Sequence, residues 1–321
     1  MNKDRLVSGE EDMKVSVAAI ATWTEGPTAD REGNIYFTDV IGNRIMKLGV
    51  DGRLSAFCNS LSANHPNGMV IDPEGRLLVC EEGDPLAGLP PRITRTDLRT
   101  GFQEVLADHY EGRRFGGPND ITFDSSGRIY FTDGDRPVFL LPYPETTGIG
   151  VPTQVVETTG VYRIDLDGGV TRILARPDIQ RPNGLMISPD DRTLYLIEND
   201  IKRNGLRRIL AYDLMTDGSV TNVRLFYDFG TGRSGDGMTV DSEGNLYVCA
   251  GLNAPRGTDE TLENKAGLYI FNPSGKKIGF IPIPEDSVTN VTFAGPDLTN
   301  LYITAGKTLY MVRGHMKGTI R

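Results

Sequence analysis

One recurring phrase limits the possible folds more than any other feature of the sequence. Its clearest copy, GGPNDITFDSSGRIYFTD at 116–133, begins with a polar segment containing Asn119, followed by an alternating apolar run, a turn closed by Gly127 and a second run. Two short runs rich in Ile, Tyr, Phe and Thr around such a turn predict a hairpin of two antiparallel strands. The hairpin is therefore the unit from which we expect the fold to be built.

The phrase occurs six times, and each copy begins with a polar residue that we call the tip residue. The six tip residues are Glu25, Asn67, Asn119, Asn183, Asp236 and Asn290. Successive tips lie 42 to 64 residues apart, which leaves room for about four short strands in each repeat. An internal repeat of this length is typical of a β-propeller. We therefore predict an all-β fold, a six-bladed β-propeller with four-stranded antiparallel blades.

The two ends of the chain are predicted to meet in the last blade. The final repeat ends with LYITA and LYMVR and is one strand short, while the strand pattern KVSVAAIAT at 14–22 stands alone. We predict that this N-terminal strand completes the last blade, because ring closure removes exposed strand edges. Residues 1–13 are polar and acidic, so we expect a flexible leader followed by a single propeller domain over 14–321.

Charge and cysteine content limit the partners and the compartment. A formal net charge of -9 disfavours nucleic acid and anionic membranes, which both need a basic surface, and favours cations. Cys58, Cys80 and Cys249 are widely spaced, so we predict buried thiols in a reducing compartment rather than a disulfide framework. The sequence has no signal-peptide core and no apolar run long enough to span a bilayer. We expect a soluble cytoplasmic protein.

The tip residues also predict a metal site. If the repeats are related by rotation, the tips bring two carboxylates and four amides to one mouth of the central channel. Oxygen donors without Lys, Arg, His or Cys suit a hard cation. An Asn ahead of a strand often serves its own turn, which is the role expected for Asn290. Turn chemistry does not explain Glu25, so we predict ligation by Glu25, Asn183 and Asp236, and Asn119 fits either role.

Two other groups of segments have simpler interpretations. Asp-x-x-Gly turns occur in several repeats but lack the later acidic residues of a calcium loop, so we interpret them as hairpin turns: Asp72–Gly75, Asp124–Gly127 and Asp241–Gly244. Longer inserts follow the second strand of some repeats and are expected on one rim, where functional loops gather. These inserts are 83–91, 134–160 and 251–266.

Four motifs occur in a fixed order along most of the chain. They are TEGPTADREGNIYFTD, GPNDITFDSSGRIYFTD, RPNGLMISPDDRTLYL and SGDGMTVDSEGNLYVCAG. Together they resemble the family of gluconolactonase, senescence marker protein (regucalcin) and luciferin-regenerating enzyme, over about residues 15–313. The resemblance implies a six-bladed propeller with one divalent metal in the channel. It also implies Glu25, Asn183 and Asp236 as metal ligands, with Asn119 contacting the metal or the substrate.

The resemblance implies an activity as well. Members of the family hydrolyse sugar lactones, so we expect a hydrolase of carboxylic esters that opens an aldonolactone by a metal-polarised carbonyl and a metal-activated water. Asp236 is the expected general base and, with Asn119, the expected catalytic residue, although a metal-held hydroxide is the alternative nucleophile. Calcium is the expected cofactor, and Mg²⁺, Mn²⁺, Zn²⁺ or Fe²⁺ would accept the same ligands.

The substrate contacts are less well defined by the resemblance. In the animal branch of the family an arginine two residues before the third tip holds the sugar, whereas this chain has Gly117. Arg114 is close enough in sequence to replace it. We predict substrate contacts from Arg114, Asn67 and His65, with a proton shuttle or a structural role as the alternatives for His65.

Two other functions remain open at this stage. A metal-dependent phosphotriesterase or P–F hydrolase is one, because a relative of the family is the calcium-dependent diisopropylfluorophosphatase. The other is a non-enzymatic propeller that presents its rim to a protein partner. Converging carboxylates in a channel argue against the second alternative, since a scaffold has no use for them.

Overall fold

The computed structural model describes residues 14–58, 63–84, 88–134, 158–314 and 317–319. All regular secondary structure in these residues is β-structure, and none of it is helical. The described part of the chain accordingly contains no helix long and apolar enough to cross a membrane. The predicted leader at 1–13 and most of the insert at 134–160 lie outside the described residues.

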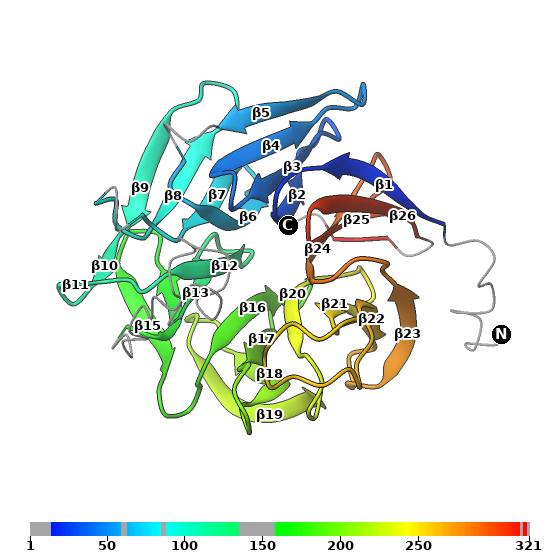
Figure 1. Cartoon of the computed structure of the whole chain (residues 1–321). Coiled ribbons are helices and arrows are strands. Elements are labelled where there is room, and N and C mark those ends of the chain that lie inside the picture. Colours follow the sequence, from blue (N-terminus) through cyan, green and yellow to red (C-terminus); the bar gives the residue numbers. More distant parts are fainter. Residues whose placement is uncertain (1–13, 59–62, 85–87, 135–157, 315–316, 320–321) are drawn as a thin grey trace.

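Six four-stranded antiparallel sheets surround a central axis as the blades of a propeller (Figure 1). Blade 1 contains β2 (Thr24–Ala29), β3 (Ile35–Asp39), β4 (Arg44–Leu48) and β5 (Leu54–Cys58). Blade 2 contains β6 (Pro66–Ile71), β7 (Arg76–Glu81), β8 (Arg92–Asp97) and β9 (Gln103–Ala107). Blade 3 contains β12 (Pro118–Phe123), β13 (Ile129–Asp133), β14 (Gly160–Ile164) and β15 (Val170–Ala175). A short hairpin of β10 (His109–Tyr110) and β11 (Arg113–Arg114) precedes blade 3.

The other three blades follow the same order from the axis outward. Blade 4 contains β16 (Pro182–Ile187), β17 (Thr193–Asn199), β18 (Arg207–Leu214) and β19 (Val220–Asp228). Blade 5 contains β20 (Gly235–Val240), β21 (Leu246–Ala250), β22 (Gly267–Phe271) and β23 (Lys277–Pro282). Blade 6 contains β24 (Val288–Ala294), β25 (Asn300–Ala305), β26 (Thr308–Arg313) and the N-terminal β1 (Val15–Ile20). The predicted six-bladed propeller is confirmed.

The N-terminal strand closes the ring. β1 pairs antiparallel with β26, with Val15 opposite Val312 and Ile20 opposite Thr308. The strand order in blade 6 is β1-β26-β25-β24, so the first strand of the chain is the outermost strand of the last blade. This confirms the predicted closure, and it covers one edge of β26 that would otherwise be unpaired.

The core lies between neighbouring blades, because each sheet packs a face on the next. One cluster joins Leu78, Cys80 and Ile93 of blade 2 to Ile121 and Phe131 of blade 3. Second strands such as β3 and β13 are buried along their whole length, which explains their nearly continuous apolar sequence. Cys80 and Cys249 are fully buried, as predicted, and none of the three cysteines forms a disulfide.

Candidate functional site

The six tip residues occupy equivalent places at the centre of the propeller. Each tip is the second residue of its innermost strand, except in β24, where it is the third. The innermost strands contact one another in a closed ring, so the tips surround the channel. All six are between 2% and 8% exposed. The structure thus brings together the polar set that the repeat predicts.

A break in the strand register lies at or directly beside each tip. In every blade the pairing of the innermost strand with its neighbour is irregular at the tip, as between Glu25 and Thr28 or between Pro182 and Leu185. The same irregularity occurs in the remaining four blades. Bulges of this kind bend a strand and re-aim its side chains. Asn67, Asn119, Asn183 and Asp236 therefore lie outside the regular ladder, whereas Glu25 and Asn290 keep a partner in it.

Glycines after four of the tips allow neighbouring blades to approach closely. A Cβ on Gly26 would lie 2.3 Å from the Asn67 carbonyl oxygen, and one on Gly184 would lie 2.3 Å from the Asp236 carbonyl oxygen. A Cβ on Gly68 would lie 2.5 Å from the Asn119 carbonyl oxygen, and one on Gly237 would lie 2.1 Å from Cγ of the Asn290 side chain. A side chain at any of these positions would push two tips apart. Glycine is thus required for the spacing of the ring.

Asp236 has the best-defined surroundings of the six tips. Asn183 Nδ2 donates a hydrogen bond to Asp236 Oδ1 at 2.8 Å, and Arg233 forms an ion pair with Asp236 Oδ2. Arg233 is only 3% exposed. Burial alone would lower its pKa, but the carboxylates of Asp236, Glu260 and Glu25 outweigh burial and raise the pKa above its ordinary value. A cationic side chain therefore lies among the acidic groups of the ring.

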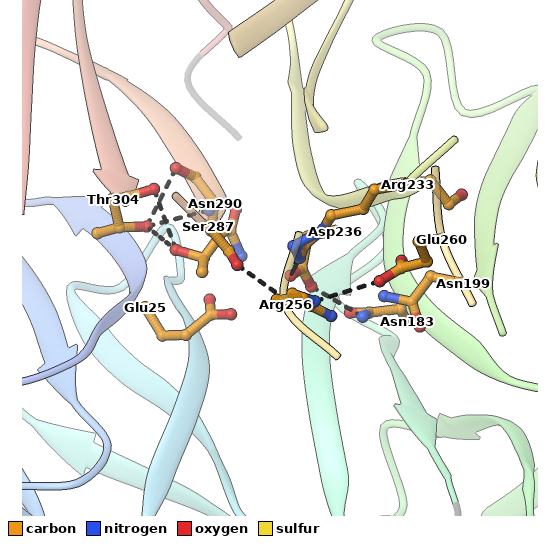
Figure 2. Close-up of polar contacts among 12 residues, drawn as sticks. Glu25, Asn183, Asn199, Arg233, Asp236, Arg256, Glu260, Ser287, Asn290 and Thr304 are labelled. Carbon is orange, nitrogen blue, oxygen red and sulfur yellow. Dashed lines mark hydrogen bonds and ion pairs between the residues drawn. The ribbon is translucent and has the colours of Figure 1, made fainter. Parts of the chain in front are cut away.

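The insert at 251–266 contributes two more charged side chains to this mouth. Arg256 Nε donates to Glu260 Oε2 at 3.2 Å, and Arg256 Nη1 donates to Ser287 Oγ at 2.8 Å. Ser287 directly precedes β24, so Arg256 connects the blade 5 insert to blade 6. In the view of Figure 2, Arg256 lies between Glu25 on one side and the Asp236–Asn183 pair on the other. The insert therefore reaches across part of the ring.

Asp120 replaces the glycine that follows the tip in four other blades. Its carboxylate accepts a hydrogen bond from the backbone N–H of Ile121 at 3.0 Å, and it also hydrogen-bonds to the Asn290 side chain. Burial raises the pKa of Asp120 to about 7, and repulsion from Asp236 adds to the increase. Asn290 Oδ1 accepts the N–H of Val291, which agrees with the turn role expected for this tip.

The predicted substrate contacts are spread over several places. Asn67 Nδ2 donates to the buried Glu82 at 2.5 Å. The His65 ring lies 3.4 Å from the Val40 carbonyl oxygen and 3.7 Å from the Asp84 carboxylate, contacts that suit a structural role. The exposed Arg114 lies on β11 and pairs with Asp108. Substrate binding by these residues stays a prediction.

The ring also fits the predicted divalent cation. Glu25, Asn119, Asn183 and Asp236 all carry side-chain oxygens, and the hydrogen bond from Asn183 Nδ2 to Asp236 Oδ1 brings two of these side chains together. No group of three or more His, Cys, Asp or Glu residues could hold a metal in the described part of the chain. No such group is expected among the four proposed ligands, because two of them are asparagines.

Sequence reasoning missed several members of this site. Arg233, Glu260 and Arg256 stand outside the repeated phrase, and two of them come from an insert. Arg233 could have been noticed because it precedes the Asp236 tip by only three residues. Asp120 had a clearer signal, since it breaks the series of glycines that follow the tips.

The fold and the site define a class: a closed six-bladed propeller with an oxygen-rich polar centre buried at one mouth of its channel. The chain belongs to the SMP-30/gluconolactonase/LRE-like family, whose model matches residues 23–307. It is 30% identical to a gluconolactonase of Zymomonas mobilis, and the match covers 94% of this chain and 82% of that protein.

Solved structures agree with this assignment. A gluconolactonase from Xanthomonas campestris is 27% identical, with a TM-score of 0.73 over 94% of this chain and 90% of that one. Regucalcin from Agrobacterium tumefaciens, described as a calcium-binding protein, has a TM-score of 0.69 at 18% identity, over 97% of this chain and 98% of that one. The second likeness concerns the fold alone.

Proposed function

We propose that this protein is a metal-dependent lactonase that hydrolyses an aldonolactone or a similar lactone. Family membership and the relatives named gluconolactonases support the reaction class. The observation that carries the proposal is the ring itself, in which Glu25, Asn119, Asn183 and Asp236 are all buried at one mouth of the channel. The absence of any disulfide among the three cysteines supports a reducing, cytoplasmic location as part of the proposal.

Four tips would hold the divalent cation: Glu25, Asn119, Asn183 and Asp236. When bound, such a cation polarises a carbonyl oxygen and lowers the pKa of a water molecule. Calcium is our first choice because every donor is an oxygen. The carboxylates of Glu25 and Asp236 supply negative charge, and Arg233 compensates part of it. The two amides add neutral donors, so the site is acidic without being heavily charged.

The chain's own residues perform the remaining tasks. Asp236 accepts a proton from the attacking water, because its carboxylate is held at the centre of the ring by Asn183 and Arg233. Arg256 lies across the same mouth and is held by Glu260 and Ser287. A fixed guanidinium in this place provides donors for oxygen atoms of the substrate or of the opened product.

The test is hydrolysis of D-glucono-1,5-lactone followed by a pH indicator, with and without chelator. We expect activity to disappear with EDTA and to return with Ca²⁺ or another divalent ion. Glu25→Gln should need a higher metal concentration to recover its activity. In the same samples, metal at 100 times its Kd should stabilise the protein by about 2.7 kcal/mol. Arg192→Met, at an exposed position, is the control. Full activity in EDTA-treated, metal-free protein would refute metal dependence.

Asp236→Asn tests the proton-accepting role. We expect kcat to fall about 100-fold or more while added metal still raises the unfolding temperature, because an amide retains an oxygen donor but is not a base. Unchanged turnover would eliminate Asp236 as the base. Hydrolysis of diisopropyl fluorophosphate in place of every lactone would instead favour the alternative P–F hydrolase.

A further inference from the structure

Two buried polar atoms beside the ring have no hydrogen-bond partner among the described residues. They are Arg233 Nη1, a donor, and Asn199 Oδ1, an acceptor. Arg233 is 3% exposed and Asn199 is 9% exposed. A buried polar group without a partner costs about 1–3 kcal/mol, so such groups are rare and need an explanation. At the mouth of a channel, a ligand that completes both bonds is one such explanation.

The two atoms belong to the same part of the site. Ser234, next to Arg233, donates from Oγ to the carbonyl oxygen of Glu198, next to Asn199, at 2.9 Å. This bond connects the segment before β20 to the end of β17. In Figure 2, the side chains of Arg233 and Asn199 lie on the same side of the mouth as Asn183, Asp236 and Glu260, opposite Glu25. Both side chains therefore lie on the Asp236 side of the mouth, where the proposed chemistry occurs.

A side-chain contact holds Arg233 in place, and a backbone contact holds Asn199. Arg233 is anchored through Nη2 on Asp236, so its Nη1 cannot turn away without breaking a buried ion pair. Asn199 is the last residue of β17, and its backbone N–H donates to the Arg181 carbonyl oxygen at 3.2 Å. The site thus presents a donor held by the Asp236 ion pair and an acceptor on a residue at the end of β17.

Hydroxyl groups suit both atoms, because a hydroxyl accepts through its lone pairs and donates its proton. We propose that Arg233 and Asn199 form a hydroxyl-binding subsite that makes this protein select polyhydroxylated lactones over lactones without hydroxyl groups. The inference rests on the proposed lactonase function and adds specificity-determining residues to it. A hydroxyl would supply the partners that these buried atoms lack, whereas a CH₂ group would leave both without partners.

The first experiment compares two six-carbon 1,5-lactones, D-glucono-1,5-lactone and δ-hexanolactone, which differ only in hydroxyl groups. We expect the wild-type protein to prefer the first. In Asn199→Leu and in Arg233→Met, the ratio of the two kcat/KM values should fall by about 10- to 100-fold. The exposed Arg192→Met should leave the ratio unchanged. A wild-type ratio near one, or an unchanged ratio in either subsite variant, would overturn the inference.

A binding measurement separates this inference from the proposed function. Calorimetry on the EDTA-treated protein compares D-gluconate with hexanoate, which share a carboxylate and differ in hydroxyl groups. We expect tighter binding of D-gluconate in the wild type and loss of that difference in both subsite variants. If neither lactone is hydrolysed but this difference is found, the lactonase proposal fails and the subsite stands. If D-gluconate binds no better than hexanoate, the subsite is refuted.

The stability of Asn199→Leu provides a third test. A purely structural role for Asn199 predicts that this variant unfolds at a lower urea concentration than the wild type, whereas a ligand-binding role does not. Because the amide oxygen has no protein partner in the described residues, Asn199→Leu should unfold at the same urea concentration as the wild type or a higher one. Clear destabilisation of Asn199→Leu, with the lactone ratio intact, would show that the residue serves the fold.

Discussion

At the scale of single residues, the centre of the propeller holds a further buried carboxyl group beside the Glu25 and Asp236 tips. Asp120 is the clearest case, because four blades have glycine at the equivalent position. Its carboxyl is 7% exposed and hydrogen-bonds to the Ile121 N–H and the Asn290 side chain. Burial raises its pKa from 3.8 to about 7, so folding favours the protonated form. Asp120 therefore connects the stability of the propeller to pH.

We predict that Asp120→Asn removes a pH-dependent part of the stability of the metal-free protein. A carboxyl whose pKa is raised by folding stabilises the folded state fully below its unfolded pKa, and this contribution is lost as pH rises through the folded value. With a shift from 3.8 to about 7, the loss occurs between about pH 4 and pH 7. In urea unfolding with EDTA, the free energy of unfolding of the variant should rise relative to that of the wild type from pH 5 to pH 8.

The comparison of variant and wild type at each pH isolates Asp120 from other titrating groups. The difference in the free energy of unfolding should grow by a few kcal/mol over this range. If the difference is the same at pH 5 and at pH 8, the Asp120 carboxyl does not have a raised pKa.

At the scale of elements, one aspartate organises the turn of the inner hairpin in blades 2, 3 and 5. Asp124 Oδ1 accepts the backbone N–H groups of Ser126 and Arg128, and its Oδ2 accepts Arg128 Nε at 2.6 Å and Tyr130 Oη at 3.0 Å. Asp72 and Asp241 bond to their own turns in the same manner. Gly127, with φ of +86°, closes the turn in a conformation that favours glycine. These contacts explain the Asp-x-x-Gly motif without calcium.

We predict that Asp124→Ala costs about 3 kcal/mol of unfolding free energy. The substitution removes one partner of a buried ion pair and leaves Tyr130 and two backbone donors without an acceptor. The matched control is Asp167→Ala in the outer turn of the same blade, where the exposed Asp167 accepts only the Gly169 N–H in the described contacts. That control should cost less than about 1 kcal/mol. Equal effects in urea unfolding would contradict a special role for Asp124.

At the scale of the whole molecule, the two ends of the chain meet in one blade. β1 covers the free edge of β26, and Thr289 Oγ1 donates to the Thr24 carbonyl oxygen at 2.9 Å, which joins blade 6 to blade 1. Figure 1 shows the first and last strands side by side in that blade. Because the tips converge only when the ring is closed, this closure also holds the geometry of the site.

We predict that deletion of residues 1–20 destabilises the protein by roughly 4 kcal/mol or more, since the ladder of β1 and its apolar contacts are lost. The exposed β26 edge should also promote dimers or aggregates. Deletion of residues 1–13 leaves β1 intact and is the matched control. Urea unfolding and light scattering after gel filtration check both effects. Equal stability of the two deletions would show that β1 does not secure the ring.

The sequence by itself determined the six blades, their four strands each and the closure of the ring, but not the extra hairpin of β10 and β11. These features depend on the alternation of apolar and polar residues, on turns such as Asp124–Gly127 and on the repeated phrase. Each of these can be recognised in short continuous stretches of the sequence. Internal symmetry extended this information to the site, because equivalent positions in a ring must converge. The tips Glu25, Asn183 and Asp236 were predicted in this way.

Only the tertiary structure decided what surrounds the tips. Arg256 comes from an insert that the other repeats lack, whereas Arg233 and Asn199 stand at positions where the other repeats have different residues, so symmetry does not predict any of these side chains. Their placement depends on contacts between blades, such as Ser234 with Glu198 and Arg256 with Ser287. Such contacts join residues 31 to 36 positions apart in sequence, and no local pattern records them. The ring could therefore be predicted from the chain, whereas the subsite beside it required the folded molecule.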